Sequence, residues 1–134
     1  MVLTFDEVGE RLDAMAEEFP PVFCRELNGG ISLLPEAVED PEFPPGEIYI
    51  MGEYCDDQMG RYIQLYYGSF AALAEKEDWT VEAWDDELYT TLAHEFTHHI
   101  EGLAQEFGLD RKDEEELAAF RAYYNERHPR KRGS

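Results

Sequence analysis

Hydrophobic positions near the N-terminus recur with the period of an amphipathic helix. Thr4 and Glu7 have the spacing of a capping box, in which each side chain accepts a hydrogen bond from the other residue's backbone N–H. Pro20 and Pro21 follow, and proline cannot continue a helix. The sequence therefore predicts a helix that begins after Thr4, ends before Pro20 and buries one apolar stripe, made of Phe5, Val8, Leu12, Met15 and Phe19.

The middle of the chain carries short apolar runs separated by turn residues, which is the pattern of a small sheet. We expect strands over 31–34, 47–54 and 61–67, with a proline-rich loop over 35–46. Few residues separate the second strand from the third, so these two strands should pair antiparallel. We take 61–67 as an edge strand of the sheet.

A long helical pattern occupies 81–107, with Thr80 placed to cap its first turn and Gly108 placed to end it. Its apolar residues form a broad arc, so this helix should be central and largely covered. A last helix is expected over 110–127, with an inward stripe of Leu117, Phe120 and Tyr124. Together these elements predict an α+β fold, in which a small, mostly antiparallel sheet of about three strands packs beside the long helix.

The length and charge of the chain change this picture only at its C-terminal end. A chain of 134 residues suits one domain, which we place over 1–126. Residues 127–134 contain basic side chains and no acid, and we expect a disordered tail there. The net charge of −20 argues against binding to nucleic acid or to an anionic membrane surface.

The sequence also indicates the cellular compartment in which we expect the protein. No stretch is apolar enough to predict a membrane span, and the first residues lack the pattern of a secretory signal. Cys24 and Cys55 are the only cysteines, and they are too far apart for a CxxC motif. Two cysteines do not make a disulfide framework, so we expect a reduced, cytoplasmic protein.

Residues 94–98 read His-Glu-Phe-Thr-His, an HExxH motif inside the long predicted helix. An α-helix turns about 100° per residue, so the imidazoles of His94 and His98 should lie on one face, about 40° apart. Two imidazoles so placed can bind one metal ion, and Zn²⁺ is the usual one. Glu95 would then be close enough to take a proton from a water on the metal. The alternative is two histidines on a helix surface beside a salt-bridging glutamate.

Zinc needs a third protein ligand, and the sequence leaves its identity open. Asp113 is the first candidate, because the inward stripe of the last helix reaches it when extended back by one turn, although Asp113 could instead cap that helix. Glu101 is the second candidate, because it lies on nearly the same face as His94. His99 is turned away from the pair, and we expect it to pack in the core or to support a ligand from behind. Other acids, or water, complete the alternatives.

The stretch 94–101, HEFTHHIE, with its tandem histidine, resembles the zincin-like metallopeptidases, in particular the small bacterial minimal zincins. The YYGSF stretch at 66–70 and the order of the elements are also similar to that group. The resemblance implies a minimal zincin-like α+β fold, zinc on His94 and His98, and Glu95 as the general base.

The chain departs from one branch of these enzymes. Glu101 and Ala104 stand where the metzincin pattern has a glycine and a third histidine. An acid from a following helix, as in the gluzincins, is therefore the closer analogy, and Asp113 is the residue to which it leads.

We therefore expect a zinc-dependent hydrolase, and a peptidase in particular, that acts on peptide or protein substrates. Zincins usually bind an extended peptide along an edge strand, and 61–67 is the candidate for that strand. The main alternative is a non-catalytic domain, metal-stabilised or vestigial, that binds a partner protein. A third hypothesis, prompted only by the negative charge, is an acidic mimic of nucleic acid that occupies basic proteins.

Overall fold

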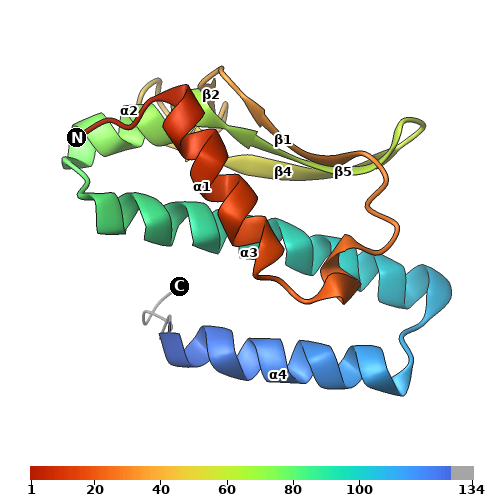
Figure 1. Ribbon diagram of the computed structural model, residues 1–134. Coiled ribbons are helices and arrows are strands. Elements are labelled where there is room, and N and C mark those ends of the chain that lie inside the picture. Colours follow the sequence, from red (N-terminus) through yellow and green to blue (C-terminus); the bar gives the residue numbers. More distant parts are fainter. Residues whose placement is uncertain (128–134) are drawn as a thin grey trace.

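The computed structural model describes residues 1–127, and Figure 1 shows how the helices and strands are arranged. The predicted tail over 127–134 lies outside the described residues, apart from the backbone of Arg127. Within the described part the fold is α+β, as predicted, with four α-helices, a three-stranded sheet and a two-stranded sheet. In chain order the elements are α1 (Phe5–Glu17), the 3-10 turn η1 (Pro21–Cys24), β1 (Gly30–Leu34), β2 (Val38–Glu39), β3 (Tyr49–Ile50), β4 (Gly52–Asp57), β5 (Gly60–Tyr66), α2 (Tyr67–Glu77), α3 (Val81–Phe107) and α4 (Arg111–Arg127).

β5 lies in the centre of the three-stranded sheet, whose order is β1-β5-β4. β4 pairs with β5 antiparallel, as predicted, through a tight turn between Asp57 and Gly60. β1, in contrast, pairs with β5 in parallel. The sheet is therefore mixed and not mostly antiparallel. The prediction that 61–67 forms an edge strand is wrong, because β5 has a neighbour on each side and β4 and β1 are the edges.

The strand predicted over 47–54 breaks at Met51 and contributes to two sheets. Its first part, β3, pairs with β2, which lies inside the segment expected to be a loop. Its second part begins β4 at Gly52, where a Cβ would lie 3.1 Å from the backbone oxygen of Gln64 and 3.2 Å from the Thr91 side chain. Glycine therefore eases the close approach of β4 to both β5 and α3.

α3 is the central element of the fold, with the sheet along one side, α1 crossing it and α4 running beneath it (Figure 1). The apolar arc of α3 is buried as predicted, and burial of such an arc supplies most of a helix's stability. The core that α3 shares with the sheet has several side chains with no exposed surface, among them Ile63, Leu65, Leu88, Leu92 and Phe96. Only one face of α3 is left exposed beside β4, and this face carries His94 and His98.

The helix ends are those that the sequence predicts. Thr4 and Glu7 form the capping box of α1, with hydrogen bonds of 2.8 and 3.1 Å. The Thr80 hydroxyl accepts a hydrogen bond from the N–H of Ala83 in the first turn of α3, and Gly108 ends that helix with a φ of 74°. None of the helices within residues 1–127 combines the length and the apolar composition that crossing a membrane requires.

Gly68 explains part of the YYGSF stretch, because it lets the start of α2 touch the backbone that follows β1. The N–H of Gly68 donates a hydrogen bond to the carbonyl of Glu36 at 3.0 Å. A Cβ at Gly68 would lie 2.5 Å from the backbone nitrogen of Ala37 and 2.6 Å from the carbonyl carbon of Glu36. Backbone atoms cannot give way as the tip of a side chain can, so this contact requires glycine.

We expect Gly68→Ala to lower the free energy of unfolding by about 1–3 kcal/mol, which is the usual cost of overpacking. Urea unfolding followed by circular dichroism measures the difference. Gly9→Ala is the matched control, because a Cβ at Gly9 meets nothing within 4 Å in the middle of α1. The control should raise stability by about 0.5–1 kcal/mol, and a similar loss in both variants would contradict the proposed contact.

Candidate functional site

Both histidines of the HExxH motif lie on the exposed side of α3 and face each other. The Nε2 atoms of His94 and His98 are 3.1 Å apart, and their ring centroids are 4.6 Å apart. Two nitrogens that bind one zinc ion at about 2.0–2.1 Å each, with tetrahedral angles, lie about 3.3 Å apart. The spacing of the two rings therefore fits a metal ion held between them.

The histidine pair borders an open cleft of about 590 Å³ between α3 and the edge strand β4. The side chain of His98 is 47% exposed, so a molecule from solvent can reach the pair. The residues that line the cleft are Gly52, Glu53 and Tyr54 from β4, and His94, Glu95, His98, Glu101, Gly102 and Gln105 from α3. Two of the lining carboxylates, those of Glu53 and Glu101, belong to exposed residues.

Glu95 lines the same cleft although only 6% of its surface is exposed. Its carboxylate has no hydrogen-bond or ion-pair partner within residues 1–127. Burial raises the pKa of Glu95, while nearby His94 and His98 act in the opposite direction. A carboxylate with a raised pKa is suited to accept a proton and to release it again.

Glu101 lies behind one of the two histidines. Its Oε1 is 3.6 Å from Nδ1 of His98, on the opposite side of the ring from the Nε2 that faces His94. A carboxylate in this place fixes the orientation of a metal-binding imidazole and makes it a better ligand. The geometry therefore favours a role for Glu101 in supporting His98 over the role of metal ligand that the sequence suggests.

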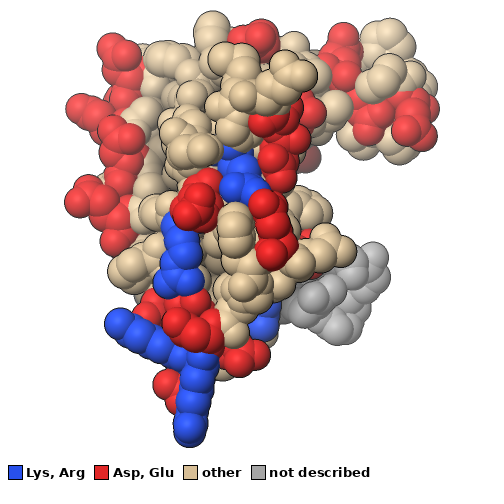
Figure 2. Space-filling model, turned by 90° about the vertical axis from the view of Figure 1, so that its right-hand side faces the viewer, with Lys and Arg blue, Asp and Glu red and all other residues tan. Residues whose placement is uncertain are grey.

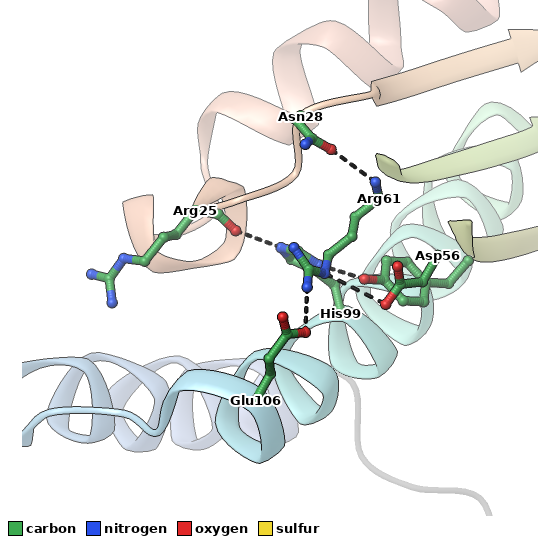
Figure 3. A network of polar contacts seen from close by, with 7 residues as sticks. Arg25, Asn28, Asp56, Arg61, His99 and Glu106 are labelled. Atoms are coloured by element: carbon green, nitrogen blue, oxygen red, sulfur yellow. Dashed lines mark hydrogen bonds and ion pairs between the residues drawn. The ribbon is translucent and has the colours of Figure 1, made fainter. Parts of the chain in front are cut away.

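His99 is fully buried, as predicted, and it takes no part in the histidine pair. Its Nε2 lies 2.7 Å from the carbonyl oxygen of Arg25, and its Nδ1 lies 2.9 Å from the Tyr54 hydroxyl (Figure 3). A carbonyl can only accept, so Nε2 carries the proton and the Tyr54 hydroxyl donates to Nδ1. Burial lowers the pKa of His99, which keeps the ring neutral. His99 therefore joins β4 and the segment after η1 to α3.

Arg61 holds the other end of β4 in place. Its guanidinium forms an ion pair with Glu106 near the end of α3 and lies 3.5 Å from Asp56 of β4 (Figure 3). Its backbone N–H donates to the side chain of Asn28 at 2.8 Å. The wall of the cleft that β4 forms is thus fixed to α3 at two points, His99 and Arg61.

Asp113 lies away from the histidines, so it does not complete the predicted ligand set. Its side chain is 3% exposed and forms two hydrogen bonds with the guanidinium of Arg25, one of them 2.7 Å long. This pairing lowers the pKa of Asp113. The cap of α4 is Asp110, whose carboxylate accepts from the N–H of Asp113 at 2.8 Å.

The direction in which α4 packs explains why Asp113 misses the pair. Phe120 of α4 contacts Phe19 and Phe23, and both of these rings also contact Phe96 of α3. Phe96 is two residues from His94, which places the two side chains about 200° apart around the helix. α4 therefore lies against the side of α3 that points away from the histidines. Within residues 1–127 no three His, Cys, Asp or Glu side chains are grouped to hold a metal ion.

The sequence did not single out Glu53, Tyr54 or Arg25. Glu53 and Tyr54 belong to a strand that the sequence predicts, but the sequence does not say that this strand forms the wall opposite the motif. Arg25 follows η1 without any motif of its own. Only the tertiary contacts of these residues reveal their roles.

Comparison with known proteins finds similarity to a solved structure. No protein-family model matches the chain, and no curated protein does either. A conserved hypothetical protein from Thermus thermophilus has a similar structure, with a TM-score of 0.64 and 34% sequence identity. The similarity covers 76% of this chain and 98% of that one. The chain therefore belongs to the same protein family as this conserved hypothetical protein.

Proposed function

We propose that this protein is a zinc-dependent hydrolase, and specifically a peptidase, whose centre is the HExxH motif of α3. One observation carries the proposal: two imidazole nitrogens 3.1 Å apart lie beside the largely buried carboxylate of Glu95 in an open cleft. Exposed histidines at i and i+4 can arise without a function. The carboxylate of Glu95 opens on the same cleft beside the two imidazoles, and this position supports a chemical role for it.

In the proposed reaction each residue of the site has a different role. His94 and His98 would hold the metal ion through their Nε2 atoms, and Glu101 would orient His98 from its Nδ1 side. Zinc, when bound, lowers the pKa of its water to about 7 and polarises the carbonyl of the substrate. Glu95 accepts the proton of the attacking water and passes it to the leaving amine. Among the described residues only His94 and His98 are placed to bind the metal, so water would have to complete its coordination.

The cleft also offers a place for an extended peptide. β4 forms one wall of the cleft and has only β5 as a neighbour in its sheet. A peptide can add to the free side of such a strand through backbone hydrogen bonds. β4 therefore replaces 61–67 as the strand along which we propose that the substrate binds.

A cytoplasmic location belongs to the same proposal. Cys24 and Cys55 are both free thiols, as expected for a protein in a reducing compartment. Cell fractionation with antibody detection tests this location, and recovery of the protein outside the cytoplasm would contradict it.

Metal analysis and a peptide assay test the proposed function. We expect purified protein to contain about one zinc ion per chain and to hydrolyse some members of a fluorogenic peptide library. A chelator should abolish this hydrolysis, and added zinc should restore it. His94→Ala and His98→Ala should lose the metal, whereas Thr97→Ala, an exposed change between them, should keep it. Hydrolysis that survives complete removal of the metal would overturn the proposal.

The second candidate function is a non-catalytic partner-binding domain. Within residues 1–127 no third His, Cys, Asp or Glu is placed to bind a metal ion together with the pair, and this favours the candidate because a vestigial site loses ligands. Zinc content without turnover of any peptide in the library would support the partner-binding domain over the peptidase.

A further inference from the structure

Among residues 1–127, the cleft beside the histidine pair is lined by carboxylates and by no lysine or arginine. Glu53 stands on the β4 wall and Glu101 on the α3 wall, and both residues are exposed. Glu95, only 6% exposed, adds a third carboxylate to the lining of the cleft. Both elements that form the cleft therefore carry carboxylates at its border.

Glu53 is also held in a fixed position. The hydroxyl of Tyr66, a residue only 6% exposed, donates a hydrogen bond to Oε1 of Glu53 and lies 3.4 Å from Oε1 of Gln64. Burial, followed by the contact with Glu53, raises the pKa of Tyr66, so its hydroxyl stays protonated and remains a donor. A neutral donor leaves the negative charge on Glu53 while it fixes the side chain. Such a carboxylate can select a cation with little loss of side-chain freedom.

Four arginines among residues 1–127 pair with acidic side chains outside the cleft. Figure 2 shows one end of the protein, where the basic side chains lie among acidic ones. The arginines with acidic partners are Arg11 with Asp85, Arg25 with Asp113, Arg61 with Glu106 and Arg111 with Glu115. The net charge of −20 also attracts cations and repels anions over distances longer than a contact.

We propose that this cleft takes peptide segments that carry lysine or arginine, and that Glu53 determines this preference. The proposal rests on the proposed peptidase function, for which it names the substrate class. Side chains of an extended peptide alternate along the edge of β4, so those on one side of the peptide would meet Glu53. An exposed carboxylate–ammonium pair of this kind contributes up to about fivefold in affinity.

Peptide binding to the Glu95→Gln protein tests the proposal without turnover. The probes are a fluorescein-labelled octapeptide of alanine and glycine with two lysines at alternate positions, and its counterparts with glutamine or glutamate. We expect the lysine peptide to bind about two- to fivefold more tightly than the glutamine peptide, and the glutamate peptide to bind most weakly. Fluorescence anisotropy measures the three affinities, and the differences should shrink as salt is added.

A second substitution in the Glu95→Gln protein distinguishes a local effect of Glu53 from an effect of the net charge of the whole protein. Glu53→Gln keeps an acceptor for Tyr66 and should bring the lysine-to-glutamine affinity ratio close to one. Glu82→Gln changes the net charge equally on an exposed part of α3 outside the cleft, and it should leave the ratio unchanged. Glu53→Lys should reverse the order, so that the glutamate peptide binds best.

Several outcomes would overturn this inference: equal binding of the three peptides, no binding of any, or the same change in ratio from Glu53→Gln and Glu82→Gln. Its failure is distinct from failure of the peptidase proposal. Charge-selective binding without hydrolysis by the wild-type protein would refute only the peptidase. Hydrolysis of all three peptides at one rate would refute only the charge preference.

Discussion

Replacing Glu95 with glutamine is expected to leave zinc binding intact and to lower kcat by about 10²- to 10⁴-fold, the usual contribution of general acid–base catalysis. Glutamine matches glutamate in size but cannot accept a proton from water. Zinc should be retained because the imidazole nitrogens of His94 and His98, and not Glu95, face the position between the two rings. Metal analysis and initial rates with a fluorogenic peptide measure the two quantities on the same sample.

Glu82→Gln is the matched control for this variant. Glu82 lies in the first turn of the same helix, is exposed and is not among the residues of the cleft. The control removes the same charge, so its zinc content and its kcat should both remain close to those of the wild type. Equal rates in the Glu95→Gln and Glu82→Gln proteins would exclude Glu95 as the base, and loss of zinc from Glu95→Gln would make Glu95 part of the metal site.

The helices and the histidine pair could be predicted because their determinants lie close together in the sequence. A capping box involves residues three apart, and Thr4 and Glu7 form it as expected. The facing of His94 and His98 follows from the pitch of one helix, which needs no knowledge of the fold. Local features of this kind can be predicted from the sequence because they do not depend on contacts with distant parts of the chain.

The order of the strands could not be predicted, because pairing joins residues that are far apart in the chain. Gly30 lies opposite Tyr62, and Leu34 lies opposite Tyr66, in the parallel pair of β1 and β5. Alternation along a strand tells which side chains share a face, but it does not tell which strand lies alongside. The sequence pattern therefore predicts the wrong segment as the edge strand, and with it the wrong wall for the proposed peptide site.

The prediction for Asp113 was half right, and the two halves have different physical origins. The helical stripe indicated that Asp113 faces inward, and its side chain is indeed only 3% exposed. The stripe could not indicate which other element of the fold Asp113 would contact. Asp113 meets Arg25, a residue from the other end of the chain, because α4 docks on the aromatic side of α3. Helical periodicity fixes the direction of a side chain within its own helix, and only packing decides its partner.

The second large effect that we expect is a loss of stability when Phe96, on the aromatic side of α3, is replaced. Phe96 has no exposed surface, and its ring centroid lies 4.8 Å from that of Phe19 and 5.3 Å from that of Phe23. We expect Phe96→Ala to lower the free energy of unfolding by about 3–5 kcal/mol, because it removes a large buried ring and leaves a cavity. A loss of this size is a large part of the about 5–15 kcal/mol that a domain of this kind has. Urea unfolding of metal-free protein measures it.

His94→Ala is the matched comparison, since His94 lies two residues away on the exposed side of the same helix. In metal-free protein it should change the free energy of unfolding by less than about 0.5 kcal/mol. The two sides of α3 would then be separable: Phe96→Ala would weaken the fold, and His94→Ala would remove only the metal. Comparable destabilisation by both changes would mean that the histidine pair is part of the folded framework. In that case the pair could not be read as an open site, and the peptidase proposal would lose its geometric basis.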